Sequence, residues 1–434
     1  MKKRIFNNLI LASAIRIFLM RSNYQSIISE RVEVSTALNS WKRVTEGVYL
    51  RNQGIDPYSG DVFHETPIGL AIFASLQMHL SNWALCVLFI LTDLATALFL
   101  AATAKLYIQE LIVKEKEERT HFVNDTNEKS QTSMGDISST AVIYIPAAYL
   151  FNPYVVLNCV GFTTTVFTNF LYSAALYFMI RQWTVGSSLA NALLTLQGLY
   201  PVNLMIPTII YSSRGKNGHD VLWVIVKTIL IYCIISIALL SISYYITGSW
   251  SFLRSTFGFI LTVPDLRPNI GLYWYFFTEM FEHFRWLFVA SFQINVGTLY
   301  VVPLALRLRR DPLLLAFSFL AITSIFKSYP CIGDVGFYMS LLPLWKHLFR
   351  YMQQGFVIGC FILFCTVFAP TVWHQWIYSR SANANFYFGV TLAFAIAQIF
   401  LLTDVLFTSI KREFVTRHGF GDEINGNKVK FLLE

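Results

Sequence analysis

The sequence predicts an all-α, polytopic membrane protein with about twelve transmembrane helices. The first observation is composition: 55% of the 434 residues are hydrophobic and only 13% are charged, whereas a soluble domain carries about 25% charged residues. The second is the aromatic content, 38 Phe and 22 Tyr, because aromatic rings gather at lipid interfaces. The third is that basic residues come in short clusters between apolar runs. This pattern is typical of membrane flanks, so the net charge of +8 does not indicate nucleic-acid binding.

The N-terminal part predicts two crossings on either side of a long lumenal loop. Apolar residues 5–20 follow a basic tripeptide and precede no small-residue cleavage site, so they are predicted to be an uncleaved signal anchor. Residues 22–66 are then lumenal. The short apolar piece 67–80 is predicted to lie at the membrane surface, and residues 82–104 cross back.

The rest of the chain alternates between apolar runs and three less regular segments. Residues 105–139 are predicted to be one long cytosolic loop, with LysGluLysGluGluArg at 114–119. Residues 187–211 are divided at Tyr200-Pro201 and predict two short helices that return to the cytosolic side. The aromatic segment 247–284 is predicted to lie along the lumenal interface or to pack on a partner. The remaining runs predict one crossing each: 140–160, 164–180, 221–246, 285–306, 312–326, 332–345, 353–372 and 386–410.

This trace agrees with the positive-inside rule, because short loops on its cytosolic side are richer in Lys and Arg. Both termini, including the tail 411–434, are then cytosolic, and residues 1–434 form a single membrane domain. The one N-glycosylation sequon, Asn124-Asp125-Thr126, falls on the cytosolic side, so Asn124 is predicted to carry no glycan.

Catalytic and metal-binding motifs are not found. The six cysteines lie mainly inside apolar runs without CxxC or Cys/His metal spacing, which predicts neither disulfides nor a metal site, and no cofactor is expected. Acidic residues of the first loop could act as a base or hold a metal ion, and ionisable residues in spans are functional candidates. Solvated charges near helix ends explain both groups as well: Glu30, Glu33, Glu46, Asp56, Asp61 and Glu65 in the loop, and Asp93, Lys227, Glu279, Asp334 and Asp404 at the spans.

The last lumenal loop, residues 374–386, is polar and compact. Its amides at Asn383 and Asn385 offer donors and acceptors without charge, which suits sugar hydroxyls and phosphate oxygens. A helix cap by Ser381 or Asn383 explains the same residues equally well.

Several motifs together resemble the U subunit of the glycosylphosphatidylinositol (GPI) transamidase. The most specific is the aromatic block ValProAspLeuArgProAsnIleGlyLeuTyrTrpTyrPhePheThrGluMetPheGluHisPhe at 263–284. The likeness covers almost the whole chain except residues 112–138 and the end of the tail. The other motifs are IleSerGluArgValGluValSerThr at 28–36, AspProTyr at 56–58, GluThrPro at 65–67, PheLysSerTyrPro at 326–330 and SerAlaAsnAlaAsnPhe at 381–386.

The resemblance implies a non-catalytic subunit of an endoplasmic-reticulum complex. That complex cuts a C-terminal signal from a precursor protein and joins the new carboxyl end to a preassembled GPI lipid. The implied partners are a caspase-like cysteine protease subunit, which performs the chemistry, the other transamidase subunits and the lipid. By this resemblance Asn383 and Asn385 fall at the lipid-contact motif.

Two further sets of residues are predicted to bind partners. The aromatic block exposes more apolar area than an isolated loop tolerates, which indicates an interaction site, and its predicted contact residues are Trp274, Phe276, Phe277 and Phe281. Basic residues on the predicted cytosolic side suit anionic phospholipid head groups, although ordinary positive-inside flanks explain any single one of them: Lys216, Arg307 and Arg309.

The family in turn is similar to the multispan mannosyltransferases of GPI assembly, which implies a glycosyltransferase-C-like scaffold. Those enzymes carry ThrAspIleAspTyr in the first loop, where this chain has GluArgValGluVal at 30–34. Arg31 and Glu33 stand in place of the two aspartates. Because arginine can neither act as a base nor bind a divalent cation, the enzymatic site is predicted to be lost. The alternative is an active dolichol-phosphate-mannose-dependent mannosyltransferase, and a transporter is disfavoured by the lack of inverted repeats.

Overall fold

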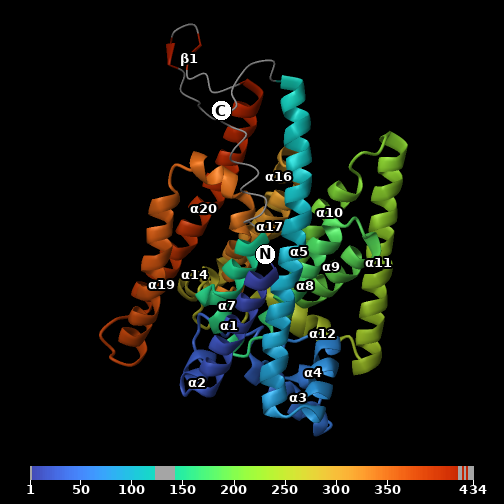
Figure 1. The fold of residues 1–434 in the computed structure, drawn as a ribbon. Helices are drawn as coiled ribbons and strands as arrows, with labels where there is room; N and C mark the ends of the chain where they lie inside the picture. The colour runs from blue at the N-terminus through green and yellow to red at the C-terminus, as the bar shows by residue number, and fades with distance from the viewer. Residues whose placement is uncertain (1, 123–141, 419–422, 425–426, 429–434) are drawn as a thin grey trace.

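The computed structural model describes residues 2–122, 142–418, 423–424 and 427–428, which form an elongated bundle of helices (Figure 1). Within these residues the strands are the two-residue β1 (Glu423–Ile424) and β2 (Asn427–Lys428), which pair antiparallel in the tail. The predicted all-helical class is therefore confirmed. The sequon at Asn124 lies outside the described residues.

The first half of the chain builds one side of the bundle. Proline begins several of its elements, at the position where a helix can spare the N–H group. Its helices are α1 (Lys2–Arg21), α2 (Tyr24–Ser29), α3 (Trp41–Asn52), η1 (Pro57–Ser59), α4 (Pro67–His79), α5 (Asn82–Phe122), a helix at Val142–Leu150, α7 (Pro153–Val160), α8 (Thr165–Ile180), α9 (Thr184–Gly198), η3 (Tyr200–Leu204) and α10 (Met205–Ser212).

The second half completes the bundle and includes two π-helical turns, η4 and η5. Its helices are α11 (Gly218–Thr247), α12 (Ser251–Leu253), η4 (Arg254–Gly258), α13 (Phe259–Thr262), α14 (Tyr273–Glu279), α15 (Glu282–Ile294), η5 (Asn295–Leu299), α16 (Val301–Arg307), α17 (Pro312–Phe326), α18 (Ile332–Leu341), η6 (Leu342–Tyr351), α19 (Gly355–Ile377) and α20 (Ala384–His418).

Five stretches of helix are long and apolar enough to cross a membrane, and a bent pair makes a sixth. Two shorter apolar helices, α8 and α17, lie among them. The protein is thus a multi-pass membrane protein. The long candidates are Asn82–Lys114, Gly218–Thr247, Glu282–Arg307, Gly355–Ile377 and Ala384–Phe414, with the bent pair Val142–Leu150 and Pro153–Val160.

The helix α5 continues well beyond its predicted span. A loop was predicted from Lys105, but the helix runs to Phe122 and rises above its neighbours in Figure 1. The ion pair between Glu110 and Lys114, 2.9 Å long and one turn apart, is of the kind that supports an exposed helix. The charged repeat that suggested a loop is therefore helical where the structure describes it.

The predicted division of residues 187–211 is confirmed. The helix α9 ends at Gly198, and Leu199 has the left-handed backbone angle φ 59°, which turns the chain before Pro201. The amide of Asn191 then donates to the Thr208 hydroxyl across the pair, at 3.2 Å. Two short helices thus enter and leave the bundle side by side.

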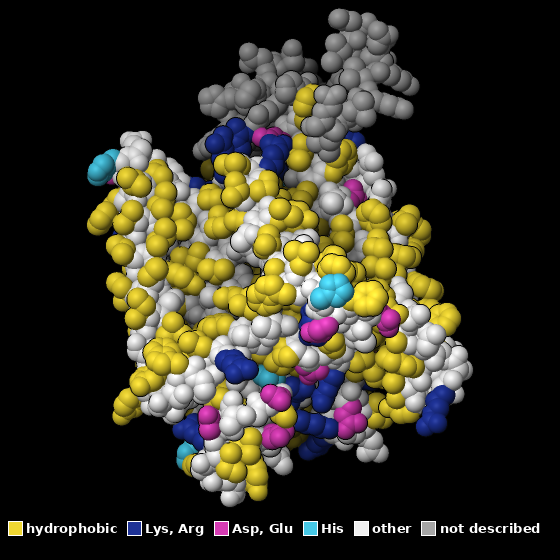
Figure 2. Space-filling model, turned by 180° about the vertical axis from the view of Figure 1, so that it is seen from behind, with side chains coloured by type: hydrophobic (Ala, Val, Ile, Leu, Met, Phe, Trp, Pro, Cys, Tyr) yellow, Lys and Arg dark blue, Asp and Glu magenta, His cyan; other side chains and the backbone are white. Residues whose placement is uncertain are grey.

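We call the two ends of the bundle the loop end and the tail end. The loop end holds residues 22–66, 248–272 and 378–383, and the tail end holds residues 213–217 and 308–311 together with the end of α20. On the face that Figure 2 shows, hydrophobic side chains cover most of the surface between the two ends, charged side chains gather at both ends, and a few acidic side chains and a histidine lie about halfway. This distribution matches a bilayer around the middle of the molecule.

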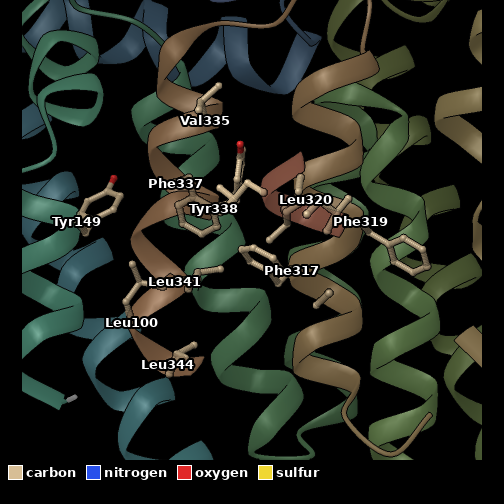
Figure 3. Packing of buried hydrophobic residues seen from close by; sticks show 14 of the residues in the cluster. Leu100, Tyr149, Phe317, Phe319, Leu320, Val335, Phe337, Tyr338, Leu341 and Leu344 are labelled. Atoms are coloured by element: carbon tan, nitrogen blue, oxygen red, sulfur yellow. The ribbon is translucent and has the colours of Figure 1, made fainter. Parts of the chain in front are cut away.

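The core lies where α17 and α18 meet the middle of the bundle. Phe317, Phe337, Tyr338 and Leu341 are almost fully buried there. Figure 3 shows Phe317 and Tyr338 between the two helices, whereas Phe337 lies on the side of α18 that faces Tyr149. The close approach of α18 to α7 depends on Gly336, because a Cβ there would lie 2.8 Å from Val155 Cγ2.

A fully buried ion pair joins α1 to α5 beside a bend in the next span. Arg16 and Asp93 are both 0% exposed and lie 2.8 Å apart, and the Tyr149 hydroxyl donates to the second Asp93 oxygen. The span bends by 48° at Pro153, and the Tyr154 N–H donates to Asn152 Oδ1 instead of continuing the helix. Arg16 donates to the carbonyl of Leu150, 3.0 Å away.

Candidate functional site

The start of α20 carries the two asparagines predicted to contact a lipid. Asn383 Oδ1 accepts the backbone N–H groups of Asn385 and Phe386, at 3.1 and 3.3 Å, so Asn383 caps the helix. Both asparagines are exposed. The capping role weighed from the sequence is therefore real, but it uses only the amide oxygen and leaves the Nδ2 donors of Asn383 on the surface.

The second asparagine ties the last loop to the aromatic block. The Tyr275 hydroxyl donates to Asn385 Oδ1, and the Tyr275 ring stacks on Phe388 with 4.5 Å between ring centroids. Trp274 packs beside this contact against Trp376 and Tyr387. The aromatic block and the start of α20, more than a hundred residues apart in the sequence, are thus in direct contact. The amide oxygen of Asn385, like that of Asn383, accepts a hydrogen bond from within the chain.

The four predicted partner-contact residues divide into two pairs. Trp274 and Phe277 are each 3% exposed and are covered by this chain itself, Phe277 by the ring of Phe292 among others. Phe276 and Phe281 remain 36% and 75% exposed. Only the second pair presents surface to a partner.

Two acids of the first loop, Glu30 and Glu33, are each paired with a basic residue. Arg31 makes a two-point contact with Glu33, at 2.9 and 3.1 Å, and Glu30 pairs with Lys42 at 2.6 Å. This contact with Lys42 lowers the pKa of Glu30. Each acid is therefore held by a cation of its own chain.

A small polar cavity of about 80 Å³ lies behind this loop, between α8, α9 and the end of α17. Glu65 lines it, and burial raises the pKa of this carboxyl to about 7, against the opposing effect of hydrogen bonds from Thr66 and Thr164. Lys327 and Asp334 also line it and form an ion pair, with 2.6 Å between Nζ and Oδ2. Among the described residues no cluster of three or more His, Cys, Asp or Glu side chains could hold a metal ion.

The remaining ionisable residues near the spans have structural roles or lie on the surface. Asp93 pairs with Arg16, Asp334 accepts the Cys331 N–H at 2.9 Å, and Asp404 accepts the N–H groups of Gln353 and Gln354 before α19. Lys227 and Glu279 are exposed.

The basic residues predicted to bind phospholipid lie at the tail end. Lys216 and Arg309 are exposed, and Arg307 pairs with Glu413 of α20 at 3.3 Å. Arg307 lines a cavity of about 170 Å³ together with Lys114 and Arg310. The structure thus brings Arg307 next to other cations and leaves Lys216 on the loop before α11.

Three residues of these sites, Tyr275, Arg16 and Lys327, were not predicted from the sequence. Tyr275 had no signal, because its contact with Asn385 spans 110 residues. Arg16 is a charge inside an apolar run and Lys327 lies seven residues before Asp334, and these features are visible in the sequence. The sequence does not show, however, that Arg16 pairs with Asp93 or that Lys327 pairs with Asp334, because that depends on the positions of the partners in the fold.

Fold and site together define a multi-pass helical membrane protein that presents a polar, aromatic-backed surface at one end. Comparison with known proteins gives the family. The family model described as "GPI transamidase subunit PIG-U" matches residues 10–394. The chain belongs to this family.

Named relatives agree along almost the whole length. The chain is 40% identical over 422 residues to the mouse GPI-anchor transamidase component PIGU, covering 95% of this chain and 94% of the relative. It is 38% identical to the human PIGU protein, with the same coverage. The Saccharomyces cerevisiae GPI transamidase component GAB1 is 30% identical, covering 90% of each chain.

Proposed function

We propose that this chain is a non-catalytic subunit of the GPI transamidase complex of the endoplasmic reticulum, and that it recognises or presents the GPI lipid for attachment to precursor proteins. The family match and the names of the relatives support the subunit role. The observation that carries lipid recognition is the geometry of Asn383 and Asn385. Both amide oxygens are used within the chain, so both exposed Nδ2 groups are donors oriented for acceptor-rich ligands.

The ligand that fits such donors is a phosphate flanked by sugar hydroxyls, as in the GPI head group. Each Nδ2 group offers two N–H donors, and phosphate and hydroxyl oxygens accept them. The loop is braced by the helix cap and by the Tyr275 contact, so little ordering is needed on binding.

The partners we propose are a caspase-like cysteine protease subunit and the other transamidase subunits. The exposed rings of Phe276 and Phe281 in the aromatic block are the contact surface in this chain. Replacing both with Ala should loosen co-purification of the partner subunits, since exposed aromatic anchors dominate interface energetics. Undiminished co-purification would assign both rings to lipid instead.

The proposed arrangement in the membrane has about twelve crossings on a glycosyltransferase-C-like scaffold. The shorter helices α1, α8, α9, α10, α17 and α18 supply the crossings beyond the long apolar ones. Both termini face the cytosol, and the loop end faces the lumen. Lys216, Arg307 and Arg309 then meet anionic phospholipid head groups of the cytosolic leaflet.

An active mannosyltransferase is not favoured. The ion pair of Arg31 with Glu33 leaves neither residue available as a base, and the relatives are named as transamidase components.

The test replaces the donors without disturbing the fold. Asn383→Asp with Asn385→Asp keeps both oxygens that accept internal hydrogen bonds and removes both NH₂ groups, and the added negative charges repel a phosphate. Surface display of a GPI-anchored reporter, in cells whose own subunit is deleted, should fall at least about tenfold, equivalent to roughly 1.4 kcal/mol. Co-purification of the complex should be unchanged.

The matched control is Asn52→Asp, an exposed amide on α3 at the same end, which should leave display normal. Normal display in the double variant would remove these asparagines from the lipid site. Loss of display together with loss of assembly would reduce Asn383 to a helix cap.

A further inference from the structure

A cavity of about 450 Å³ lies at the loop end, between two segments that are far apart in the sequence. One wall is residues 58–61 with His64, and the other runs from Arg254 in η4 to Pro264 after α13. Pockets that hold small molecules typically measure about 300–1,000 Å³, so this cavity has the size of a ligand site. We call it the loop-end pocket.

The two walls of the pocket are fixed to each other by direct contacts. The His64 ring stacks on Phe259 with 3.5 Å between ring centroids, and its Nδ1 lies 2.8 Å from the carbonyl oxygen of Ser255. The Ser255 hydroxyl donates to the carbonyl of Tyr58 at 3.1 Å. The helix α12 lies at the loop end (Figure 1), and its Phe252 packs with Tyr58 in one buried cluster. A pocket braced in this way needs little ordering when a ligand binds.

The backbone of the second wall departs from a regular helix in two places. The turn η4 is π-helical, and Val263 has the left-handed backbone angle φ 51°, which is rare for a β-branched residue. Such turns and such conformations occur frequently at functional sites. Here they flank the short helix α13, which carries Phe259 and Thr262 of the pocket wall.

Two side chains of opposite charge line the pocket. Arg254 comes from one wall and Asp61 from the other. Both are exposed, and neither side chain makes an ion pair or a hydrogen bond within the described residues. Burial lowers the pKa of His64, so its ring is uncharged at neutral pH and adds no third charge. The pocket therefore carries one cation and one anion, with no excess of either sign.

The remainder of the wall combines hydroxyl groups with apolar surface. The hydroxyls of Ser255 and Thr262 donate within the chain, so their free lone pairs are acceptors toward the pocket. Tyr58, Phe259 and Pro264 supply the apolar part. A ligand that suits this wall is neutral, offers both donors and acceptors, and has an apolar face.

A sugar ring meets all three requirements. Its hydroxyl groups donate to a carboxylate and accept from a guanidinium, and its C–H groups form an apolar face. A fatty acyl chain would leave the charges of Arg254 and Asp61 without partners, which is costly. A phosphate would be repelled by the Asp61 carboxylate.

We propose that the loop-end pocket binds a sugar residue of a glycan, with Arg254 donating to its hydroxyl groups and Asp61 accepting from them. The GPI glycan is the nearest source of such a sugar, because Asn383 and Asn385 lie at the same end of the bundle. This choice of source rests on the function proposed above. An N-linked glycan on a partner subunit offers the same chemistry.

The structure supplies variants that close the pocket or remove its donors. Gly60 lines the pocket, and a Cβ there meets no atom within 4 Å, so Gly60→Leu fills open space without a clash. Gly218→Leu, at an equally open glycine at the start of α11, is its control. Arg254→Met removes the guanidinium donors. Arg267→Met, at another exposed arginine of the loop end outside the pocket, is the matched control.

The first experiment measures sugar binding by the detergent-purified complex, after co-purification has shown that each variant assembles. The probe is methyl α-D-mannopyranoside, observed by saturation-transfer NMR. We expect the transfer to fall several-fold in Gly60→Leu and in Arg254→Met, and to be unchanged in both controls. Inorganic phosphate should not compete. Transfer that is absent from the wild type, transfer that both pocket variants leave intact, or competition by phosphate would overturn the proposal.

The second experiment identifies the source of the sugar in cells. A photo-crosslinking amino acid is placed at Ser59, which lines the pocket, or at Asn52 on α3 as the control, and the cells are fed tritiated inositol. Label that is trapped only from position 59, and is lost when GPI synthesis is blocked, assigns the GPI glycan. A subunit adduct that an N-glycosidase releases assigns an N-linked glycan and also supports the sugar site.

Three results of the crosslinking would overturn the proposal. They are a subunit adduct that resists the glycosidase, inositol label that persists when GPI synthesis is blocked, and no adduct at position 59 beyond that at position 52. The two proposals fail separately. Mannoside binding by the purified complex requires no GPI lipid, and the Asn383→Asp, Asn385→Asp variant tests the head-group site whatever fills the loop-end pocket.

Discussion

Two buried acids, Asp93 and Glu65, are accommodated in opposite ways. Asp93 stays paired with Arg16 inside the bundle, so its charge is balanced at a hydrogen-bonding distance. Glu65 makes no ion pair within the described residues and is held by Thr66 and Thr164 instead, and burial raises its pKa to about 7. Asp93 is stabilised by the positive charge of Arg16, whereas the raised pKa of Glu65 favours its neutral, protonated form.

Breaking the Arg16–Asp93 pair should destabilise the protein strongly. Arg16→Met leaves an uncompensated buried carboxylate, and removing one partner of a buried pair costs about 3–5 kcal/mol. Thermal unfolding of the detergent-purified protein should therefore shift down. The double variant Arg16→Met, Asp93→Leu should be more stable than Arg16→Met alone, because no charge is left unpaired. Strictly additive losses in the two single variants would contradict this account.

Glu65 should make stability depend on pH. Its pKa is raised to about 7 in the folded protein from the ordinary value of 4.5, so the folded state keeps a proton that the unfolded state releases. Stability is therefore greatest below the unfolded pKa and falls as pH rises through the window up to the folded pKa, by up to about 1.4 kcal/mol per pH unit.

The measurement compares the wild type with Glu65→Gln, which mimics the protonated acid at every pH. The melting temperature of the wild type relative to this variant should fall between about pH 5 and about pH 7.5. A constant difference across that range would show that Glu65 does not titrate on folding.

At the scale of single elements, the sequence predicted where helices begin and turn, but not how far a helix extends or which residues it contacts. Pro67 and Pro312 begin helices and Pro201 marks a turn where expected, because proline acts on its own backbone. The extent of α5 was missed, since charged residues suit both loops and exposed helices.

The errors in predicting the site arise from contacts between residues that are far apart in the sequence. The aromatic block was expected as a single interaction surface, yet Trp274 is buried while Phe281 is exposed. Local sequence carries no information about which ring meets Trp376 and Tyr387. Asn383 was weighed as a cap or a ligand: its oxygen caps α20, and the ligand role of its donors stays a proposal.

The contact between α18 and α7 depends on a missing side chain. Gly336→Ala should lower the melting temperature, because the new Cβ lies 2.8 Å from Val155 Cγ2 and 3.2 Å from the Val155 backbone nitrogen. Overpacking of this kind costs typically about 1–3 kcal/mol. Gly297→Ala, with open space at its Cβ, is the control, and equal melting temperatures for the two variants would refute the tight contact.

At the scale of the whole molecule, the two ends differ in a way that can be mapped by glycosylation. Ser59→Asn with Asp61→Thr creates an Asn-Gly-Thr acceptor in an exposed part of the loop end, and His219→Thr creates one at the tail end. If the loop end is lumenal, only the first variant gains a glycan, seen as a glycosidase-sensitive shift on a gel. The natural sequon at Asn124 should stay unmodified. A glycan on the tail-end variant would contradict the proposed orientation and place the tail end in the lumen.

The buried pair of Arg16 and Asp93 also constrains how the chain is made. An arginine at the centre of a single inserting helix costs about 2.5–3.5 kcal/mol, and Arg16 lies within α1, which is not among the long apolar helices. Its counter-ion is 77 residues further along the chain. We therefore expect α1 to stay at the insertion machinery, or beside it, until α5 emerges. On this account α1 is released into lipid only as half of a neutral pair.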